Sequence, residues 1–213
     1  RSRLETALRA AISNDEVYID VQPQVDQQGR TMGMEALARW HHRELGQISP
    51  AQFIPVAEAS GLIVPLGLRI LEHSCRLLAD WQQNSTTRHL SLSVNISVEQ
   101  FRHPGFVEEV IRLIDQWAIP PDRLELEVTE SLLISDLELV ASRMQTLRDH
   151  GIRFSLDDFG TGYASLGYLK RLPLYQLKID QSFVRDLLTD PDDEAIVRTI
   201  IALGVSLDLN VIA

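Results

Sequence analysis

The sequence predicts an α/β fold in which a largely parallel sheet closes into a barrel. Strand-like and helix-like segments alternate along the 213 residues, as in chains whose parallel strands are joined by helices. The strands also carry one apolar and one polar face, which is expected where aliphatic side chains pack under helices and polar ones line a barrel interior. An antiparallel sheet with one exposed face would alternate in the same way, but helices would not separate its strands.

The first expected elements are a helix over 4–12 and strands over 17–21 and 31–37. The turn-rich segment 26–30 between these strands is too short for a crossover helix, so we expect the first pair of strands to be antiparallel. The later strands are separated by helical segments, which favours parallel pairing. The remaining expected elements are helices over 50–59, 65–81, 106–117, 137–150, 164–170 and 193–207, strands over 90–95, 124–128, 152–157 and 175–180, and a strand fragment at the end of the chain.

Each strand alternates with a period of two, so its polar residues share one face. The polar faces carry Thr31, Gly33 and Glu35 in the second strand, Ser91, Ser93 and Asn95 in the third, Glu125 and Glu127 in the fourth, Arg153, Ser155 and Asp157 in the fifth, and Gln176, Lys178 and Asp180 in the sixth. Barrel enzymes gather their catalytic groups at the carboxyl ends of the strands. We therefore expect Glu35, Asn95, Glu127, Asp157 and Lys178, which occupy such ends, to form the functional site.

The segment 157–163, Asp-Asp-Phe-Gly-Thr-Gly-Tyr, follows the strand-like run that ends at Asp157. Adjacent carboxylates repel each other unless a cation compensates them, and glycines let the backbone turn sharply. An ordinary Asp-Gly turn without a ligand would have a similar pattern. Carboxylate and amide oxygens suit Mg²⁺ or Mn²⁺. Glu35, Glu127, Asp157 and Asp158 could offset two such ions, which can together activate a water for phosphodiester cleavage.

Two basic residues on the polar faces each have two interpretations. Lys178 could orient the attacking water or stabilise charge on a phosphate, or it could form a structural ion pair with an interior acid. Arg39 shares the face of Glu35 and could bind a substrate phosphate, or it could bridge a surface acid. The pattern alone does not choose between these interpretations.

Composition limits the classes of partner. A net charge of −10 argues against a nucleic-acid polymer or a membrane surface as the partner of this domain. The single cysteine, Cys75, excludes an internal disulfide and is expected to be a buried residue in a reducing compartment. No secretory signal and no apolar stretch of membrane-spanning length is present in the sequence.

Six motifs together resemble one family, the EAL-domain cyclic di-GMP phosphodiesterases. The chain is similar to that family through Met34-Glu-Ala-Leu-Ala-Arg-Trp40, Ile48-Ser-Pro-Ala-Gln-Phe-Ile-Pro-Val-Ala-Glu58, Val94-Asn-Ile-Ser97, Leu124-Glu-Leu-Glu-Val-Thr-Glu-Ser131, Leu156-Asp-Asp-Phe-Gly-Thr-Gly-Tyr163 and Leu177-Lys-Ile-Asp-Gln-Ser-Phe183. The resemblance covers essentially the whole chain, in family order. It implies a modified (β/α)8 TIM barrel with an antiparallel first strand, and hydrolysis of the bacterial second messenger cyclic di-GMP to linear pGpG with two Mg²⁺ or Mn²⁺ ions.

The resemblance also implies roles for single residues. Glu35, Asn95, Glu127 and Asp157 match ligands of one metal ion, and Asp157 and Asp158 match ligands of the second. Lys178 matches the lysine that holds the catalytic water. Glu130 matches a glutamate that braces the Asp-Asp-Phe-Gly-Thr-Gly loop. Residues matching positions near the bound dinucleotide are Gln22, Leu37, Arg39 and Asp180.

The chain is expected to be one EAL phosphodiesterase domain, 1–213, that lacks the final strand and helix of the barrel. In the family, the seventh strand reads Val-Ile-Ala and is followed by a metal-binding glutamate, whereas this sequence stops at Ala213. We therefore expect the natural protein to continue, and the activity of this chain by itself is in doubt.

The resemblance also leads to expectations about the function of the protein, its partners and its location in the cell. A catalytic phosphodiesterase is favoured because each matching catalytic position carries the required residue; the alternatives are a non-catalytic cyclic di-GMP receptor and a structural dimerisation module. The resemblance also suggests a homodimer and an upstream regulatory domain. The domain is expected to be cytoplasmic, within a protein that could carry a membrane anchor.

Overall fold

The computed structural model describes residues 2–26, 28–134, 136–161 and 166–213. These residues form two compact units, 1–125 (unit 1) and 126–213 (unit 2), and strand β5 (Leu124–Thr129) crosses the boundary between them. All the helices and strands predicted from the sequence are present, with shifted ends. The start of the short helix predicted over 164–170 lies outside the described residues, as do Gly162 and Tyr163 of the glycine-rich motif. A single domain over 1–213 stays a prediction.

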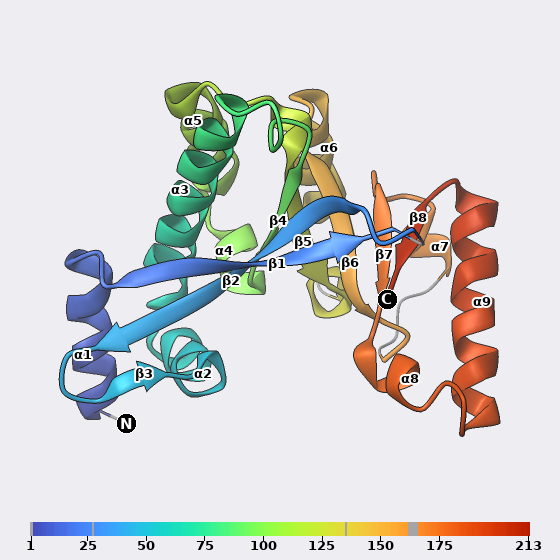
Figure 1. Cartoon of the computed structure of the whole chain (residues 1–213), viewed down its shortest axis with the longest axis horizontal. Helices are drawn as coiled ribbons and strands as arrows, with labels where there is room; N and C mark the ends of the chain where they lie inside the picture. Colours follow the sequence, from blue (N-terminus) through green and yellow to red (C-terminus); the bar gives the residue numbers. More distant parts are fainter. Residues whose placement is uncertain (1, 27, 135, 162–165) are drawn as a thin grey trace. The chain divides into compact units, whose positions relative to one another are not determined.

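Unit 1 is built on a long two-stranded ribbon with helices packed against it (Figure 1). Strand β1 pairs antiparallel with β2, as predicted, and β2 pairs antiparallel with β3 and parallel with β4. Helix α3 contacts α5, β1 and β4. The elements of this unit are α1 (Ser2–Ser13), β1 (Val17–Val25), β2 (Thr31–His42), β3 (Gly46–Ile48), α2 (Pro50–Ser60), α3 (Ile63–Gln82), β4 (Ser91–Asn95), α4 (Val98–Arg102), α5 (Phe106–Trp117) and a 3-10 turn at Pro121–Arg123.

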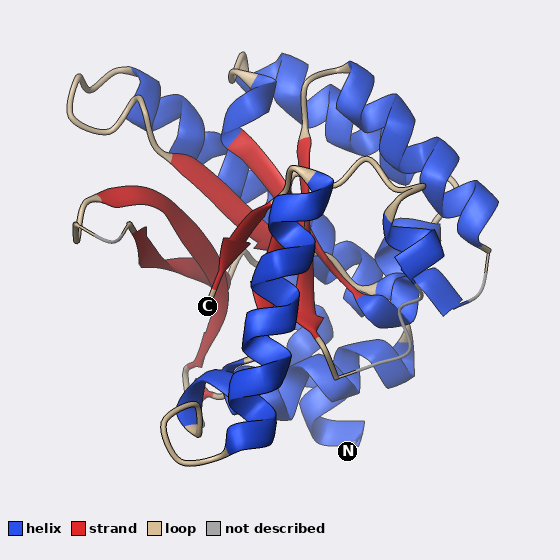
Figure 2. Ribbon diagram, turned by 90° about the vertical axis from the view of Figure 1, so that its right-hand side faces the viewer, coloured by secondary structure: helices blue, strands red, loops and turns tan. Residues whose placement is uncertain are grey.

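Unit 2 continues the alternation of strands and helices. Strands β5, β6, β7 and β8 follow one another in the sheet, with β6–β7 and β7–β8 parallel. In Figure 2, helix α9 faces the viewer and covers strands β7 and β8, which it contacts. Its elements after β5 are a 3-10 segment at Glu130–Ile134, α6 (Leu137–Asp149), β6 (Arg153–Phe159), α7 (Leu166–Leu169), β7 (Gln176–Ile179), α8 (Gln181–Arg185), α9 (Pro191–Leu207) and β8 (Asn210–Ile212).

Local sequence fixes the ends of several helices. The hydroxyl of Ser97 accepts a hydrogen bond from the backbone N–H of Gln100 and starts α4, and the carboxylate of Asp136 does the same for Leu139 in α6. Helix α2 begins with Pro50 and is capped after Ser60 by Gly61, whose φ of 72° suits a residue without a Cβ. These caps define where the helices begin and end. They thereby also help to define the positions of the adjoining strand ends, which carry the polar residues.

Each unit has its own apolar core. In unit 1, Trp40 of β2 makes an edge-to-face contact with Phe53 of α2, and both side chains are fully buried. In unit 2, Phe154 and Leu156 of β6 are fully buried, as are Met144 and Leu147 of α6. The apolar faces of these strands therefore pack against helices, as the alternation of apolar and polar residues predicted.

Candidate functional site

In unit 1, strand register brings five of the predicted site residues onto one face. Across the antiparallel β1–β2 pair, Gln22 lies opposite Glu35 and Asp20 opposite Leu37, and Tyr18 lies opposite Arg39. Paired residues point to the same side of a sheet, and so do residues two apart on one strand. Strand β4 pairs parallel with β2, with Ser93 beside Glu35 and Asn95 two residues further. The face therefore carries Gln22, Glu35, Leu37, Arg39 and Asn95.

Glu35 and Asn95 contact each other directly. The Asn95 side-chain Nδ2 donates a hydrogen bond of 2.9 Å to Glu35 Oε1, although the two residues are 60 positions apart in sequence. The carboxylate of Glu35 is thus held by a neutral amide donor. To ligate a cation with its oxygen, the Asn95 amide would have to turn and give up this hydrogen bond.

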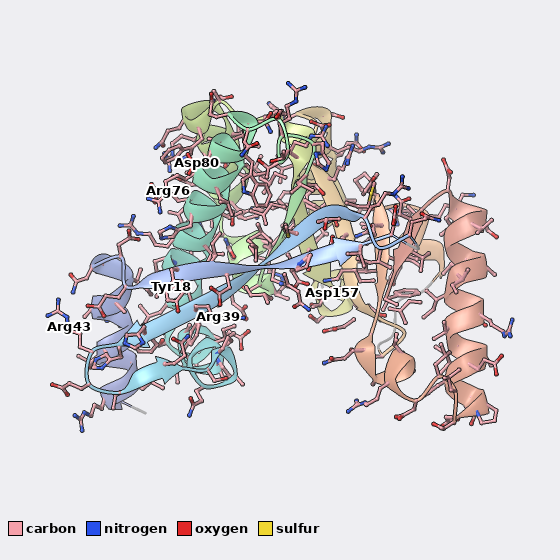
Figure 3. All side chains as sticks on the ribbon, in the orientation of Figure 1. Tyr18, Arg39, Arg43, Arg76, Asp80 and Asp157 are labelled. Atoms are coloured by element: carbon pink, nitrogen blue, oxygen red, sulfur yellow. The ribbon has the colours of Figure 1, made fainter. Side chains whose placement is uncertain are left out.

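Arg39 forms an ion pair with an acid on the neighbouring strand. Its Nε donates to Asp20 Oδ2 at 2.8 Å, and its Nη1 donates to the carbonyl oxygen of Ala38 at 3.0 Å. Figure 3 shows Arg39 and Tyr18 close together on the β1–β2 ribbon. Of the two interpretations offered for Arg39, a bridge to an acid is therefore present, and binding of a substrate phosphate stays a prediction.

In unit 2, Lys178 lies between two predicted metal ligands. Its Nζ is 2.7 Å from Glu127 Oε2 and 3.5 Å from Asp157 Oδ1. The side chains are 13%, 0% and 20% exposed, respectively. A buried carboxylate needs such a compensating charge, because low dielectric surroundings disfavour an isolated ion. The structural ion pair predicted as one interpretation of Lys178 is present, and the same contacts place its ammonium among the acids proposed for catalysis.

The two adjacent aspartates sit at an irregularity of strand β6. Leu156 pairs with Leu177 and Phe159 with Ile179, so the register shifts across Asp157 and Asp158. Asp158 has a φ of 53°, in the left-handed region that is uncommon for residues other than glycine. A regular strand would point consecutive side chains to opposite faces, and the irregularity changes the direction of this pair.

Burial and the neighbouring acids disfavour the charged form of Asp158. Burial, the charge of Asp157 and a hydrogen bond with Asp180 raise the pKa of Asp158 from 3.8 to about 6. The pKa of Asp180 is lowered instead, because the hydroxyl and the backbone N–H of Ser182 both donate to its carboxylate. Asp180 thereby caps the start of α8. Its predicted place near a substrate is untested.

Glu130 anchors the loop that follows the aspartates. Its Oε1 accepts a hydrogen bond of 2.9 Å from the backbone N–H of Gly160, and the Glu130 residue is buried. Gly160 has a φ of 104°, and a Cβ there would lie 2.9 Å from Phe183 Cε2 and 3.2 Å from Ile200 Cδ1. The hydrogen bond is the contact that a brace of this loop would make, and it ties Gly160 to the 3-10 segment Glu130–Ile134. Gly160 also lies close to Phe183 of α8 and Ile200 of α9.

The oxygen donors of these side chains are of the kind that suits a hard divalent cation. Among the described residues, no group of three histidine, cysteine or acidic side chains is placed to hold a metal ion. Lys178 occupies the space between Glu127 and Asp157 that a cation would share. Mg²⁺ and Mn²⁺ nevertheless prefer oxygen ligands of this kind. A bound cation would also lower the raised pKa of Asp158.

Three contacts were not predicted from the sequence. Asp20 was overlooked as a partner of Arg39, although it has the same parity as Gln22 in its strand and could have been found from that spacing. Ser182, which binds Asp180, follows the pattern of an acidic residue that begins a helix. The packing of Phe183 on Gly160 had no signal in the sequence, because it joins separate elements.

Comparisons with known proteins agree with these motifs. The EAL domain family model matches residues 5–213. The chain is 42% identical over 207 residues to the bifunctional diguanylate cyclase/cyclic di-GMP phosphodiesterase MucR of Pseudomonas aeruginosa, covering 97% of this chain and 30% of MucR. It is 39% identical over 210 residues to the cyclic di-GMP phosphodiesterase PdeR of Escherichia coli, covering 99% of this chain and 32% of PdeR. The chain thus spans about a third of these relatives.

Solved structures show the same likeness. A structure titled PaMucR phosphodiesterase, c-di-GMP complex, matches with a TM-score of 0.94 and 41% identity, covering 98% of this chain and 85% of that one. The EAL domain of Mycobacterium smegmatis DcpA matches with a TM-score of 0.74 and 32% identity, covering 91% and 77%. The predicted family resemblance and the predicted fold class, a modified α/β barrel with an antiparallel first strand, are confirmed.

Proposed function

Because the chain belongs to the EAL domain family, we propose that it is a phosphodiesterase that hydrolyses cyclic di-GMP to linear pGpG. Relatives that match nearly the whole chain are named cyclic di-GMP phosphodiesterases, and the matching MucR structure is described as a cyclic di-GMP complex. The observation that carries the proposal is the set of contacts that Lys178 makes with two acids, a hydrogen bond to Glu127 and an ion pair with Asp157.

The family is metal-dependent, and we propose Mg²⁺ or Mn²⁺ as the ions, two per site. Glu35, Asn95, Glu127 and Asp157 are the proposed ligands of one ion, and Asp157 with Asp158 of the other. When bound, such ions supply Lewis-acid stabilisation of the attacking and leaving oxygens of a phosphodiester. The hard oxygen donors of these side chains are consistent with this class of ion.

We propose further roles for side chains of the protein besides metal binding. The Lys178 ammonium is held by Glu127 Oε2 and can donate a hydrogen bond to the oxygen of the attacking water, which orients its lone pair toward phosphorus. Glu130 fixes the backbone after Asp158 through the Gly160 N–H, so that the two aspartates keep their direction. Gln22, Leu37, Arg39 and Asp180 are proposed to contact the dinucleotide.

The wider setting is part of the proposal. We propose that an upstream regulatory domain controls the site, since the relatives are much longer than the matched region. We also propose a homodimer, as the family resemblance implies. None of the described helices is both long enough and apolar enough to span a membrane. A cytoplasmic location stays a prediction.

The experiment that tests this function follows product and binding together. Purified protein is incubated with cyclic di-GMP and Mg²⁺, pGpG is quantified by chromatography, and a parallel calorimetric titration measures substrate binding. We expect pGpG to accumulate with Mg²⁺ and to stop when EDTA is added. Binding without any turnover would replace the enzyme with a non-catalytic receptor, and neither binding nor turnover would reject both.

A further inference from the structure

The ion pair between Asp20 and Arg39 fixes the orientation of a guanidinium on the face that carries Glu35. Arg39 is held at two points, through Nε by Asp20 Oδ2 and through Nη1 by the carbonyl of Ala38. A guanidinium has five N–H donors. In the described part of the chain, the hydrogens of Nη2 and the second hydrogen of Nη1 have no partner, and the side chain is 25% exposed. Its open edge is therefore available to an anion.

The location of this pair follows from strand register. Asp20 lies opposite Leu37, so Arg39 is its diagonal neighbour on the same face, and Gln22 and Glu35 are the next facing pair along the ribbon. Tyr18, opposite Arg39, donates a hydrogen bond of 3.3 Å to Gln47 Oε1 and is thus tied to β3. The guanidinium is held by strands, whose positions are better defined than those of loops.

We propose that Asp20 is a positioning residue that holds the Arg39 guanidinium with its open edge toward a phosphate of the bound dinucleotide. The inference rests on the proposed function. Arginine binds phosphate best through two parallel N–H donors, and this requires a fixed guanidinium plane. An arginine without Asp20 would sample several rotamers, and binding would have to order it at a cost in affinity. Asp20 itself need not touch the substrate.

A double-mutant cycle tests the proposal with Asp20→Ala, Arg39→Ala and the double variant, each assayed for kcat and KM of cyclic di-GMP hydrolysis. Asp20→Ala should raise KM about threefold to tenfold with kcat nearly unchanged, since the lost interaction is binding shared by ground and transition states. Arg39→Ala should raise KM further. In the Arg39→Ala background, removing Asp20 should change KM no more, because Asp20 acts through Arg39.

A matched control separates this role from stability of the hairpin. Arg30→Ala breaks another ion pair of the β1–β2 hairpin, in which Arg30 Nε lies 2.7 Å from Asp26 Oδ2 at the turn, and its KM should equal that of wild type. The proposal is overturned if Asp20→Ala leaves KM unchanged or lowers it, or if its effect persists without Arg39. Lack of turnover and binding in wild type would instead reject the proposed function.

Discussion

The two units hold their acidic residues in different ways. In unit 1, Glu35 accepts a hydrogen bond from the neutral amide of Asn95, and both residues belong to regularly paired strands. In unit 2, Glu127 and Asp157 are held by the charged ammonium of Lys178, and Asp158 follows at a shift in register with a positive φ. The position of the Glu35 carboxylate therefore depends on hydrogen bonding and strand register. The carboxylates of unit 2 depend on charge compensation and, for Asp158, on a strained backbone conformation.

This difference indicates where a cation matters most. Unit 2 gathers Asp157, Asp158 and Asp180, and burial together with the charges of Asp157 and Asp180 raises the pKa of Asp158 despite the opposing charge of Lys178. In unit 1, the neutral amide of Asn95 donates a hydrogen bond to Glu35, and the nearby Asp20 is paired with Arg39. Changes to charged groups should therefore have larger effects in unit 2 than in unit 1.

The largest effect is expected from Lys178→Met, which keeps the length of the side chain and removes its charge. We expect kcat to fall by about a hundredfold to ten-thousandfold, with a smaller change in KM, because the ammonium is proposed to act on the attacking water. Steady-state kinetics of pGpG formation measures both constants, and circular dichroism verifies folding, since an unpaired buried carboxylate is destabilising.

The matched control is Lys170→Met, which changes the only other lysine of the chain, an exposed residue. It should keep wild-type kinetics. A folded Lys178→Met protein that loses substrate affinity but keeps kcat would remove Lys178 from the chemical step.

A smaller effect, on stability, is expected from Gly160→Ala in unit 2. The new Cβ would meet Phe183 and Ile200 at a φ of 104°, so the free energy of unfolding should fall by about 1–3 kcal/mol. Gly46→Ala in unit 1 is the control, because its φ is also positive, at 68°, and its Cβ would meet nothing within 4 Å. It should lose only about 1 kcal/mol. Equal losses in urea denaturation would show that packing on Gly160 is unimportant.

The smallest effect is expected from Asp158→Asn, and it depends on pH. The pKa of Asp158 in the folded protein, about 6, lies above its ordinary 3.8, so this carboxyl costs stability as pH rises through that interval. Asparagine has no such carboxyl and tolerates positive φ. In metal-free buffer the variant should gain less than about 1 kcal/mol at pH 8, after allowance for solvent screening, and nothing near pH 3.5.

Thermal melting across this pH range makes the measurement. Asp208→Asn serves as its control, because Asp208 has a similar φ of 56° at the end of α9. A gain that is the same at all pH values would point to backbone conformation in place of charge.

Sequence patterns predicted the fold well because alternation and connection length are local properties. They predicted the antiparallel first pair from the short segment 26–30, and strand register bears this out. They ended the first strand at Val21, whereas β1 continues through Pro23 to Val25, which an edge strand permits. They also missed β3, since three residues are too few to show a period.

The candidate site was predictable in its residue types and less so in its contacts. Parity placed Glu35 and Asn95 on one polar face, and the two residues are hydrogen-bonded there. The pairing of Asp20 with Arg39 depends on the register of two strands, and the left-handed conformation of Asp158 depends on the shift within β6. Such contacts arise only when distant segments pack, so one sequence does not reveal them.

The rate of pGpG formation by Glu35→Gln tests the central claim, metal-dependent hydrolysis by these acids, most directly. The variant keeps the size of the side chain and removes the charge and one proposed metal ligand from unit 1. With saturating cyclic di-GMP and Mg²⁺, the account predicts a loss of about a hundredfold or more, while Glu44→Gln, at an exposed turn of the same unit, keeps the wild-type rate. A Glu35→Gln rate near that of wild type would contradict the metal assignment and the mechanism built on it.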